Sequence, residues 1–322
     1  MKTSRFGAAA AAIALSVGAL AACGGDGEAA SGSGETVRLA TGVDPSYTAI
    51  YVAEQEGFFE DHGVDVEVQK LEGGPAMAQA VIAGQSDMGT QSDGTTATQM
   101  ATDPDLRAIA DFQHSDTYIK VVWGPGVEDA SDIKKLATLP GIMTLATVRY
   151  LESQDVDPDT VELVSASPPD VPTMLNRGDV DGTVIYEPWA TRSAEEAGGE
   201  VVGSIGDFDV NYAQWLITDA NWLEDHESEA AKVLAAIKDA NDFIRDNPEE
   251  AQKIVEDAIR IPAEQTAAIM EDLVFETRDI DAEALERTKE TSQFFVDTGV
   301  MEKMPNLDEQ ILVDWMSEHV DE

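Results

Sequence analysis

The chain has 322 residues, with 63 acidic and 20 basic side chains and a formal net charge of −43 at pH 7. This balance nearly excludes nucleic-acid binding, because basic groups must meet the phosphate backbone. The charge favours solubility, and its repulsion of anions reaches only about 8 Å at physiological ionic strength. Cys23 is the single cysteine, so we expect no internal disulfide, no thiolate metal cluster and no catalytic thiol in the folded body.

The start of the chain has the layout of a secretory signal. A basic beginning precedes an apolar stretch, 6–20, that is too short to span a membrane. Residues 20–23, Leu-Ala-Ala-Cys, resemble a bacterial lipoprotein processing site. We therefore predict a signal peptide over 1–22, a lipid on Cys23, and a flexible tether rich in Gly, Ser and acidic residues over 23–35. A plain signal peptide with an incidental cysteine is the alternative.

Predicted strands and helices alternate in the next stretch of the chain. Short apolar or alternating runs predict strands, and helical spacing predicts helices, in the order 37–41, 47–59 (helix), 64–68, 76–83 (helix) and 86–90. Helices of this length between strands imply parallel pairing with right-handed crossovers. In such a sheet a ligand lies past the carboxyl ends of the strands, where loops meet helix N-termini.

The alternation continues to about residue 218, and the chain is predicted to be helical from residue 227 onward. Further strands are predicted at 106–112, 118–123, 161–165, 180–185, 201–202 and 215–218. Further helices are predicted at 94–101, 142–153 and 168–176, then from 227 and from 248, and at 263–275, 282–297 and 308–318. These elements indicate the α/β fold class.

Three segments carry a resemblance to a known family. They are Tyr-x3-Tyr-Val-Ala-x3-Gly-Phe-Phe-Glu-x2-Gly-Val-x-Val at 47–66, Glu-Gly-Gly-Pro at 72–75 and Val-Ile-Ala-Gly-Gln-Ser-Asp-Met-Gly at 81–89. They resemble the opening of solute-binding proteins of ATP-binding-cassette (ABC) importers. The subgroup is the nitrate/taurine/alkanesulfonate and thiamine-precursor (pyrimidine) one, and the resemblance covers most of the chain after residue 35.

The resemblance implies a two-lobed, periplasmic-binding-protein-like (type II) fold, with a cleft between two mixed α/β lobes. Lobe 1 is expected to be discontinuous, 36–119 and 210–322, and lobe 2 to be 120–209, joined by a two-crossing hinge. Residues 132–141 resemble the first strand and glycine turn of lobe 2. They lack the longer Gly-Lys-Lys strand and the Ser-rich turn of the commoner pattern.

The sequence lacks motifs for catalysis or metal binding. His62, His114, His226 and His319 have neither a second histidine at metal-ligand spacing nor a nearby cysteine. The sequence contains no Gly-x-Ser-x-Gly nucleophile elbow and no Gly-rich phosphate loop followed by Lys-Ser/Thr. We therefore expect a protein that is not an enzyme and that holds no metal and no cofactor.

The predicted strand ends supply candidate ligand contacts. They are Asp44, Ser46 and Tyr47, then Gly74 and Pro75, then Ser92 and Asp93, then Tyr118 near the first crossing, and Gly141 and Thr144 at the N-terminus of a predicted helix of lobe 2. Glycine admits a ligand close to the backbone, and a helix start offers N–H groups that favour an anion. The alternatives are core packing for Tyr47, plain N-capping for Asp93 and a hinge role for Tyr118.

The segment Tyr186-Glu187-Pro188-Trp189 is the sharpest candidate. A Glu-Pro-aromatic sequence after this strand recurs in the resembled family, where it faces the cleft. Pro188 also favours an extended conformation at Glu187, which directs the side chain off the strand end. We therefore predict that Tyr186, Glu187 and Trp189 contact the ligand. An inter-lobe hinge contact, or a core position for Trp189, is the alternative.

The charges in these loops favour a solute with an amine. Asp44, Asp93 and Glu187 lie at predicted strand ends, and no arginine lies in the same loops. These acids would repel a lone inorganic anion, whereas they would attract an amine, an aminopyrimidine or the amine of a zwitterion such as taurine. Aromatic residues such as Tyr47 and Tyr186 suit a planar or aliphatic body.

The function that the resemblance implies is that of an extracytoplasmic solute-binding lipoprotein, active as a monomer. Closure of the lobes would capture a small organic solute, taurine/alkanesulfonate-like or an aminopyrimidine thiamine precursor. The protein would deliver the solute to a membrane permease driven by a cytoplasmic ATPase. The lipid on Cys23 would hold it outside the cytoplasm on the bacterial cell membrane. The alternatives are an exported enzyme on the same fold and a ligand-sensing lipoprotein that feeds a receptor.

Overall fold

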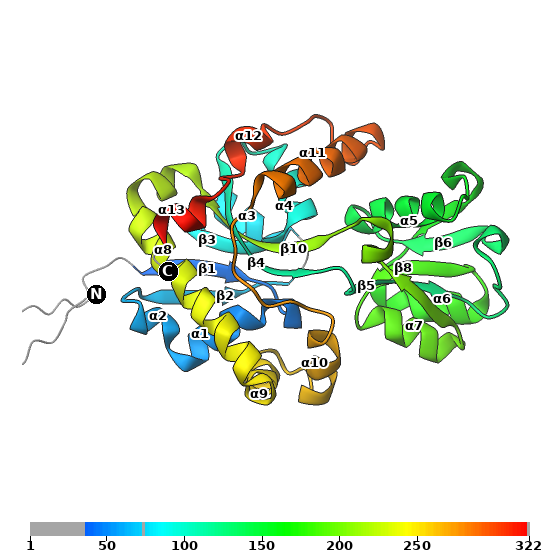
Figure 1. Ribbon diagram of the computed structural model, residues 1–322, viewed down its shortest axis with the longest axis horizontal. Coiled ribbons are helices and arrows are strands. Elements are labelled where there is room, and N and C mark those ends of the chain that lie inside the picture. The colour runs from blue at the N-terminus through cyan, green and yellow to red at the C-terminus, as the bar shows by residue number, and fades with distance from the viewer. Residues whose placement is uncertain (1–35, 73–74, 321–322) are drawn as a thin grey trace, which may run out of the picture. The chain divides into compact units, whose positions relative to one another are not determined.

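The computed structural model of the protein describes residues 36–72 and 75–320. The predicted signal peptide, the tether, Cys23 and Gly74 lie outside the described residues. The described part contains two five-stranded sheets with helices around each of them (Figure 1). The predicted α/β class and the two-lobed arrangement are therefore confirmed.

The first sheet has the strand order β2-β1-β3-β10-β4. Its members are β1 (Val37–Thr41), β2 (Val66–Lys70), β3 (Met88–Ser92), β4 (Leu106–Ser115) and β10 (Tyr212–Asp219). β1 pairs in parallel with β2 and β3, whereas β10 lies between β3 and β4 and is antiparallel to both. The carboxyl ends of β1, β2 and β3 therefore meet at one edge of the sheet.

The second sheet repeats this plan with the order β7-β6-β8-β5-β9. Its members are β5 (Ile119–Trp123), β6 (Lys135–Thr138), β7 (Glu162–Ser165), β8 (Gly182–Tyr186) and β9 (Glu200–Ser204). β6 is parallel to β7 and β8, and β5 is antiparallel to β8 and β9. The chain passes from edge strand β4 into β5, and from edge strand β9 into β10, so two crossings join the lobes (Figure 1).

Helices of the first lobe come from both ends of the described chain. They are α1 (Thr48–Glu56), α2 (Phe58–Asp61), α3 (Ala76–Ile82), α4 (Asp93–Met100), α8 (Ala220–Asp246), α9 (Pro248–Ile259), α10 (Ala263–Met270), α11 (Ala282–Asp297), α12 (Leu307–Gln310) and α13 (Trp315–His319). The second lobe carries α5 (Ile142–Ser153), α6 (Val171–Arg177) and α7 (Trp189–Ala197). α1 packs against α8 and α9, and α11 contacts both α4 and α5.

Local chemistry explains two helix boundaries that differ from the prediction. The helix predicted over 47–59 is divided at Gly57, which has φ 81° and ends α1 in a left-handed cap. The start of α8 was predicted at residue 227, but the helix begins at Ala220. Asp219 caps it there, because its carboxylate accepts hydrogen bonds from the N–H groups of Asn221 (2.9 Å) and Trp222 (3.2 Å).

Two C-terminal helices are shorter than predicted because the chain pairs with β4. The helix predicted at 263–275 ends at Met270, and the backbone at Val274 and Arg278 pairs with β4. The helix predicted at 308–318 is divided into α12 and α13, because Ile311 forms a bridge to the same strand. These contacts cover the otherwise open edge of β4.

The core of the first lobe lies between its sheet and the long helix α8. Six apolar side chains at helical spacing along α8 are all buried: Ala230, Val233, Leu234, Ile237, Ala240 and Ile244. Each large side chain among them contributes about 1.5–3 kcal/mol of burial free energy. No helix of the described residues has the length and apolarity needed to cross a membrane.

Candidate functional site

A cavity of about 590 Å³ opens between loops of the two lobes, and we call it the interlobe cleft. The first lobe lines it with residues from the segments 42–47 and 91–99, Asp93 excepted, with Tyr118 and with the start of β10. The second lobe contributes 139–143 and Tyr186. Because β1, β3, β6 and β8 all end here, the cleft occupies the position expected for a ligand in parallel sheets.

The loop after β1 is held by a carboxylate. Asp44 accepts a hydrogen bond from the N–H of Ser46 at 2.8 Å and so caps the short 3-10 helix Pro45–Tyr47. Gly42 is required beside this turn, because a Cβ there would lie 2.8 Å from Cζ of Tyr47. The turn therefore fixes both the carboxylate of Asp44 and the ring of Tyr47 against the cleft.

Four tyrosines form one wall of the interlobe cleft: Tyr47, Tyr118, Tyr186 and Tyr212. The ring of Tyr118 lies 5.9 Å from that of Tyr186 and 5.4 Å from that of Tyr212, measured between centroids. Burial, and then the charge of Asp44, raise the pKa of Tyr118 well above its usual value. We call this set the tyrosine wall; it offers apolar faces together with hydroxyl groups.

A small polar network adjoins the tyrosine wall and lines the same cleft. The hydroxyl of Tyr118 approaches Asp44 Oδ2 at 3.4 Å. Gln214 donates from Nε2 to the hydroxyl of Tyr212 at 2.6 Å and to Oγ of Ser46 at 3.3 Å. Burial raises the pKa of Asp44 above its ordinary value, although the Ser46 N–H partly offsets this. The network therefore holds one carboxylate in a site with little solvation.

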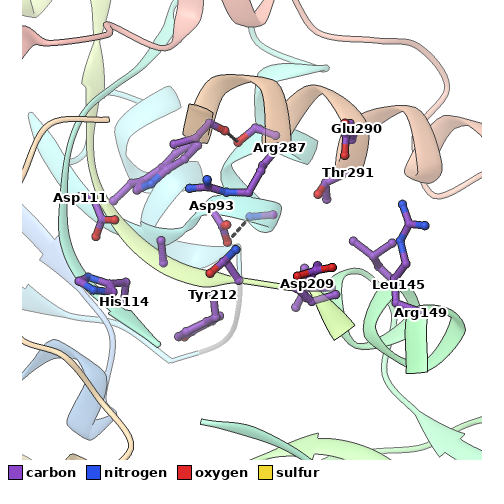
Figure 2. A pocket seen from close by; sticks show the side chains of 18 of the residues that line it. Asp93, Asp111, His114, Leu145, Arg149, Asp209, Tyr212, Arg287, Glu290 and Thr291 are labelled. Atoms are coloured by element: carbon purple, nitrogen blue, oxygen red, sulfur yellow. Dashed lines mark hydrogen bonds between the residues drawn. The ribbon is translucent and has the colours of Figure 1, made fainter. Parts of the chain in front are cut away.

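A second, smaller cavity of about 80 Å³ adjoins the cleft, and we call it the Asp93 cavity (Figure 2). Asp93 and Asp111 lie on one side of it, and α11 presents Arg287, Glu290 and Thr291 to it (Figure 2). In residues 36–72 and 75–320, no group of three or more His, Cys, Asp or Glu side chains is arranged to hold a metal ion.

The acidity of Asp93 gives a pH prediction. Burial raises its pKa to about 6, although the N–H of Gly94 at 2.7 Å and the charge of Arg287 partly offset the rise. Because the folded-state pKa exceeds the unfolded value of about 3.9, this group's stabilising contribution is present below about pH 4 and is lost as pH rises through about 6.

We therefore expect wild type to lose stability relative to Asp93→Asn as pH is raised from about 4 to about 6.5. Urea unfolding of both proteins over this range checks it. Parallel curves for the two proteins would show that Asp93 titrates normally.

A partly buried ion-pair cluster connects the lobes beside the cleft. Nζ of Lys120, on β5, lies 2.9 Å from Oε1 of Glu187 and 2.6 Å from Oδ2 of Asp272, in the loop after α10. Glu187 is 3% exposed and also accepts hydrogen bonds from the N–H (3.1 Å) and the hydroxyl (2.8 Å) of Thr191. We call Glu187, Lys120 and Asp272 the hinge triad.

Comparison with known proteins assigns the chain to a family. The model of a family described as NMT1/THI5 like matches residues 44–251, more than half of the chain. The chain belongs to the NMT1/THI5-like family. The resemblance seen in the sequence is therefore confirmed.

Relatives of this NMT1/THI5-like chain are named as binding proteins. A Bacillus subtilis protein named for the binding of aliphatic sulfonates is 20% identical over 294 residues, 88% of each chain. A Brachyspira hyodysenteriae protein named as an ABC transporter periplasmic binding protein is 24% identical over 71% of each chain. The crystal structure of the Escherichia coli periplasmic aliphatic sulphonate binding protein SsuA superposes with a TM-score of 0.77 at 17% identity, over 87% of this chain and 92% of that one. This last likeness establishes the shared fold.

In this NMT1/THI5-like protein, most of the predicted contact residues line the interlobe cleft. They are Asp44, Ser46, Tyr47, Pro75, Ser92, Tyr118, Gly141 and Tyr186. Asp93 lines the adjoining cavity instead. The hydroxyl of Thr144 donates to the carbonyl of Leu139 at 2.9 Å, and so it holds the loop that lines the cleft.

Glu187 and Trp189 follow the cleft-lining Tyr186 but lie outside the residues that line the cleft. The carboxylate of Glu187 belongs to the hinge triad. Trp189 begins α7 and packs with apolar residues of the second lobe, while the guanidinium of Arg192 lies 4.9 Å from its ring centroid. These positions favour the alternatives, an inter-lobe contact for Glu187 and packing within the second lobe for Trp189. Contact of either residue with a solute stays a prediction.

Sequence reasoning missed two polar or aromatic cleft residues of β10, Tyr212 and Gln214. The predicted strand began at Trp215, although the preceding residues 212–214 continue its extended pattern. The sequence signal that could have found them is the predicted return of the chain to the first lobe at this point. A strand that enters the sheet antiparallel to β3 brings its first residues to the edge where β3 ends, which is the edge that lines the cleft.

Proposed function

We propose that the protein is the extracytoplasmic solute-binding component of an ABC importer. The observation that carries the proposal is the interlobe cleft of about 590 Å³, bounded by strand-end loops of both lobes in a member of the NMT1/THI5-like family. A volume of this size suits a small organic molecule. Membership of the family and the names of the relatives support the transport role.

Capture is proposed to occur by rotation of the lobes about the two crossings. The first lobe contributes the tyrosine wall residues Tyr47 and Tyr212, and the second contributes Tyr186 and the loop 139–143. Closure would bring these surfaces onto the solute from both sides. The closed protein would then present both lobes to a membrane permease coupled to a cytoplasmic ATPase, with the lipid on Cys23 keeping the protein at the membrane as a monomer.

The polar groups of the cleft support binding and not catalysis. Among the described residues that line it, the ionisable side chains are Asp44 and the tyrosines, and none is a histidine, lysine or cysteine. A nucleophile with an adjacent base, the usual arrangement for covalent catalysis, is not formed by these residues. The two solute classes that we propose are a taurine/alkanesulfonate-like compound and an aminopyrimidine thiamine precursor.

Thermal unfolding of the full-length protein against a solute panel tests the proposal. The panel holds taurine, alkanesulfonates, nitrate, aminopyrimidines and small amines. A solute that binds the native state at 100 times its Kd adds about 2.7 kcal/mol of stability, so the midpoint rises with concentration. Denatured protein is also analysed by mass spectrometry for a released solute. A solute consumed during incubation would favour the enzyme alternative. If no solute shifts the midpoint and no solute is released from the denatured protein, the proposal is contradicted.

Two aromatic substitutions show which face of the Tyr186–Trp189 segment meets the solute. Tyr186→Ala removes part of the tyrosine wall and is expected to weaken binding about tenfold or more. Trp189→Ala, in the same segment, is expected to change affinity less, because its partly buried ring packs against the core of the second lobe. Titration calorimetry with the best panel solute measures both values. Equal losses in the two variants would place Trp189 in the binding surface.

A further inference from the structure

The charged side chains of the interlobe cleft are of one sign. Among the described residues that line it, none is a lysine, arginine or histidine, and the carboxylate of Asp44 is the sole acidic side chain. A charged group that enters the cleft therefore meets a negative charge and no positive side chain. A cation would be attracted to this site and an anionic head group would be repelled.

Hydrogen-bond acceptors are in surplus at the same point. Asp44 Oδ1 accepts from the N–H of Ser46, and Oδ2 accepts a long hydrogen bond from the Tyr118 hydroxyl at 3.4 Å. Gln214 is 1% exposed, and its Oε1 has no hydrogen-bond partner in the structure, although its Nε2 is fully used. A buried acceptor without a donor costs free energy, so these oxygens favour a ligand that supplies N–H groups.

The tyrosine wall surrounds these acceptors. Tyr118 lies within hydrogen-bond reach of Asp44 and packs against both Tyr186 and Tyr212, while Tyr212 accepts from Gln214. Aromatic faces attract a cation through their quadrupole, and they pack equally well on a flat or aliphatic body. The carboxylate, the free amide oxygen and the rings are thus linked in one cluster through Ser46.

We propose that the solute carries a protonated amine or amidine nitrogen, which binds between Asp44 and Gln214 against the tyrosine wall. The inference rests on the proposed function, since it assumes that the interlobe cleft is the solute site. It narrows the solute to an organic cation or to a zwitterion that presents its cationic end here. Alkanesulfonates without an amine are excluded as the physiological solute.

Ligands that share one body and differ in one head group test this inference. Binding of phenethylamine, 2-phenylethanesulfonate, taurine and ethanesulfonate is measured by titration calorimetry with the full-length protein. We expect each amine-bearing compound to bind at least about tenfold more tightly than its sulfonate counterpart without the amine. Asp44→Asn keeps an oxygen for the Ser46 N–H and is expected to abolish this preference. Asp93→Asn, the same substitution in the adjoining cavity, is the matched control and should retain it.

The outcomes separate this inference from the proposed function. Two results would overturn the inference while the transport role stands. One is tighter binding of 2-phenylethanesulfonate or ethanesulfonate than of the matching amine-bearing compound, and the other is a preference for amines that Asp44→Asn leaves unchanged. If no compound binds, the charge of the solute released on denaturation decides: a cation or an amine-bearing zwitterion supports the inference, and an anion without an amine overturns it. No binding and no released solute would overturn both.

Discussion

Replacement of Lys120 by methionine is expected to lower the free energy of unfolding by about 2–3 kcal/mol, near the range for breaking a buried ion pair. Lys120 is the cation of the hinge triad, and the side chain of Glu187 beside it is only 4% exposed. Methionine keeps the length of the side chain but leaves Glu187 with the Thr191 hydrogen bonds alone. Urea unfolding of wild type and variant measures the loss.

Lys135→Met is the matched control for the hinge triad. Lys135 pairs with Glu162 at 3.0 Å, and both side chains are about half exposed or more, at 47% and 62%. Pairs of this kind contribute about 0–1 kcal/mol. Because Asp272 belongs to the first lobe and Lys120 to the second, Lys120→Met is also expected to change solute affinity. Similar stability losses in the two variants would show that the triad is no stronger than a surface pair.

Removal of the guanidinium of Arg278 is the second large expected effect. The side chain of Asp111 is 6% exposed, and its Oδ2 accepts from Nε (2.9 Å) and Nη2 (2.8 Å) of Arg278. Its Oδ1 is buried without a hydrogen-bond partner. Arg278→Ala therefore leaves a buried carboxylate uncompensated and is expected to cost about 2–3 kcal/mol at about pH 8, allowing for the partial exposure of Arg278.

The cost of Arg278→Ala should depend on pH. Burial already raises the pKa of Asp111, to about 7, against the opposing effect of Arg278, and loss of the guanidinium raises it further. The destabilisation should therefore be smaller at about pH 5, where Asp111 is protonated, than at about pH 8. Arg149→Ala, which removes an exposed partner of Glu152 at 3.3 Å, is the control. A pH-independent loss would contradict this account of Asp111.

Elements defined by local pattern were predicted well from the sequence. The helix at 142–153 and the strand at 37–41 have the predicted bounds. The strand predicted at 64–68 is shifted by two residues, to Val66–Lys70, because pairing with β1 sets its register. The prediction of one helix at 308–318 was wrong because of a contact that is also distant in the sequence: the bridge to β4 that divides this segment joins residues about 200 positions apart.

The sequence predicted those cleft residues that directly follow a predicted strand. Asp44, Ser46 and Ser92 line the cleft because they follow parallel strands, which the alternation of elements indicates. Gln214 was missed because only the assembled sheet shows that β10 lies beside β3. Glu187 was predicted to contact the ligand from the local effect of Pro188 on its conformation. In the structure its carboxylate pairs with Lys120, which lies 67 positions earlier in the chain, and no local pattern reveals this pairing.

A crystal structure of the protein with its tightest-binding solute tests the central claim most directly. The account predicts that the solute lies in the interlobe cleft, against Tyr118 and Tyr186, with a nitrogen within hydrogen-bond distance of Asp44. It also predicts that loop 139–143 of the second lobe contacts the solute. A solute bound elsewhere, for example in the groove lined by Lys238, Pro248 and Val274 on the first lobe, would contradict it.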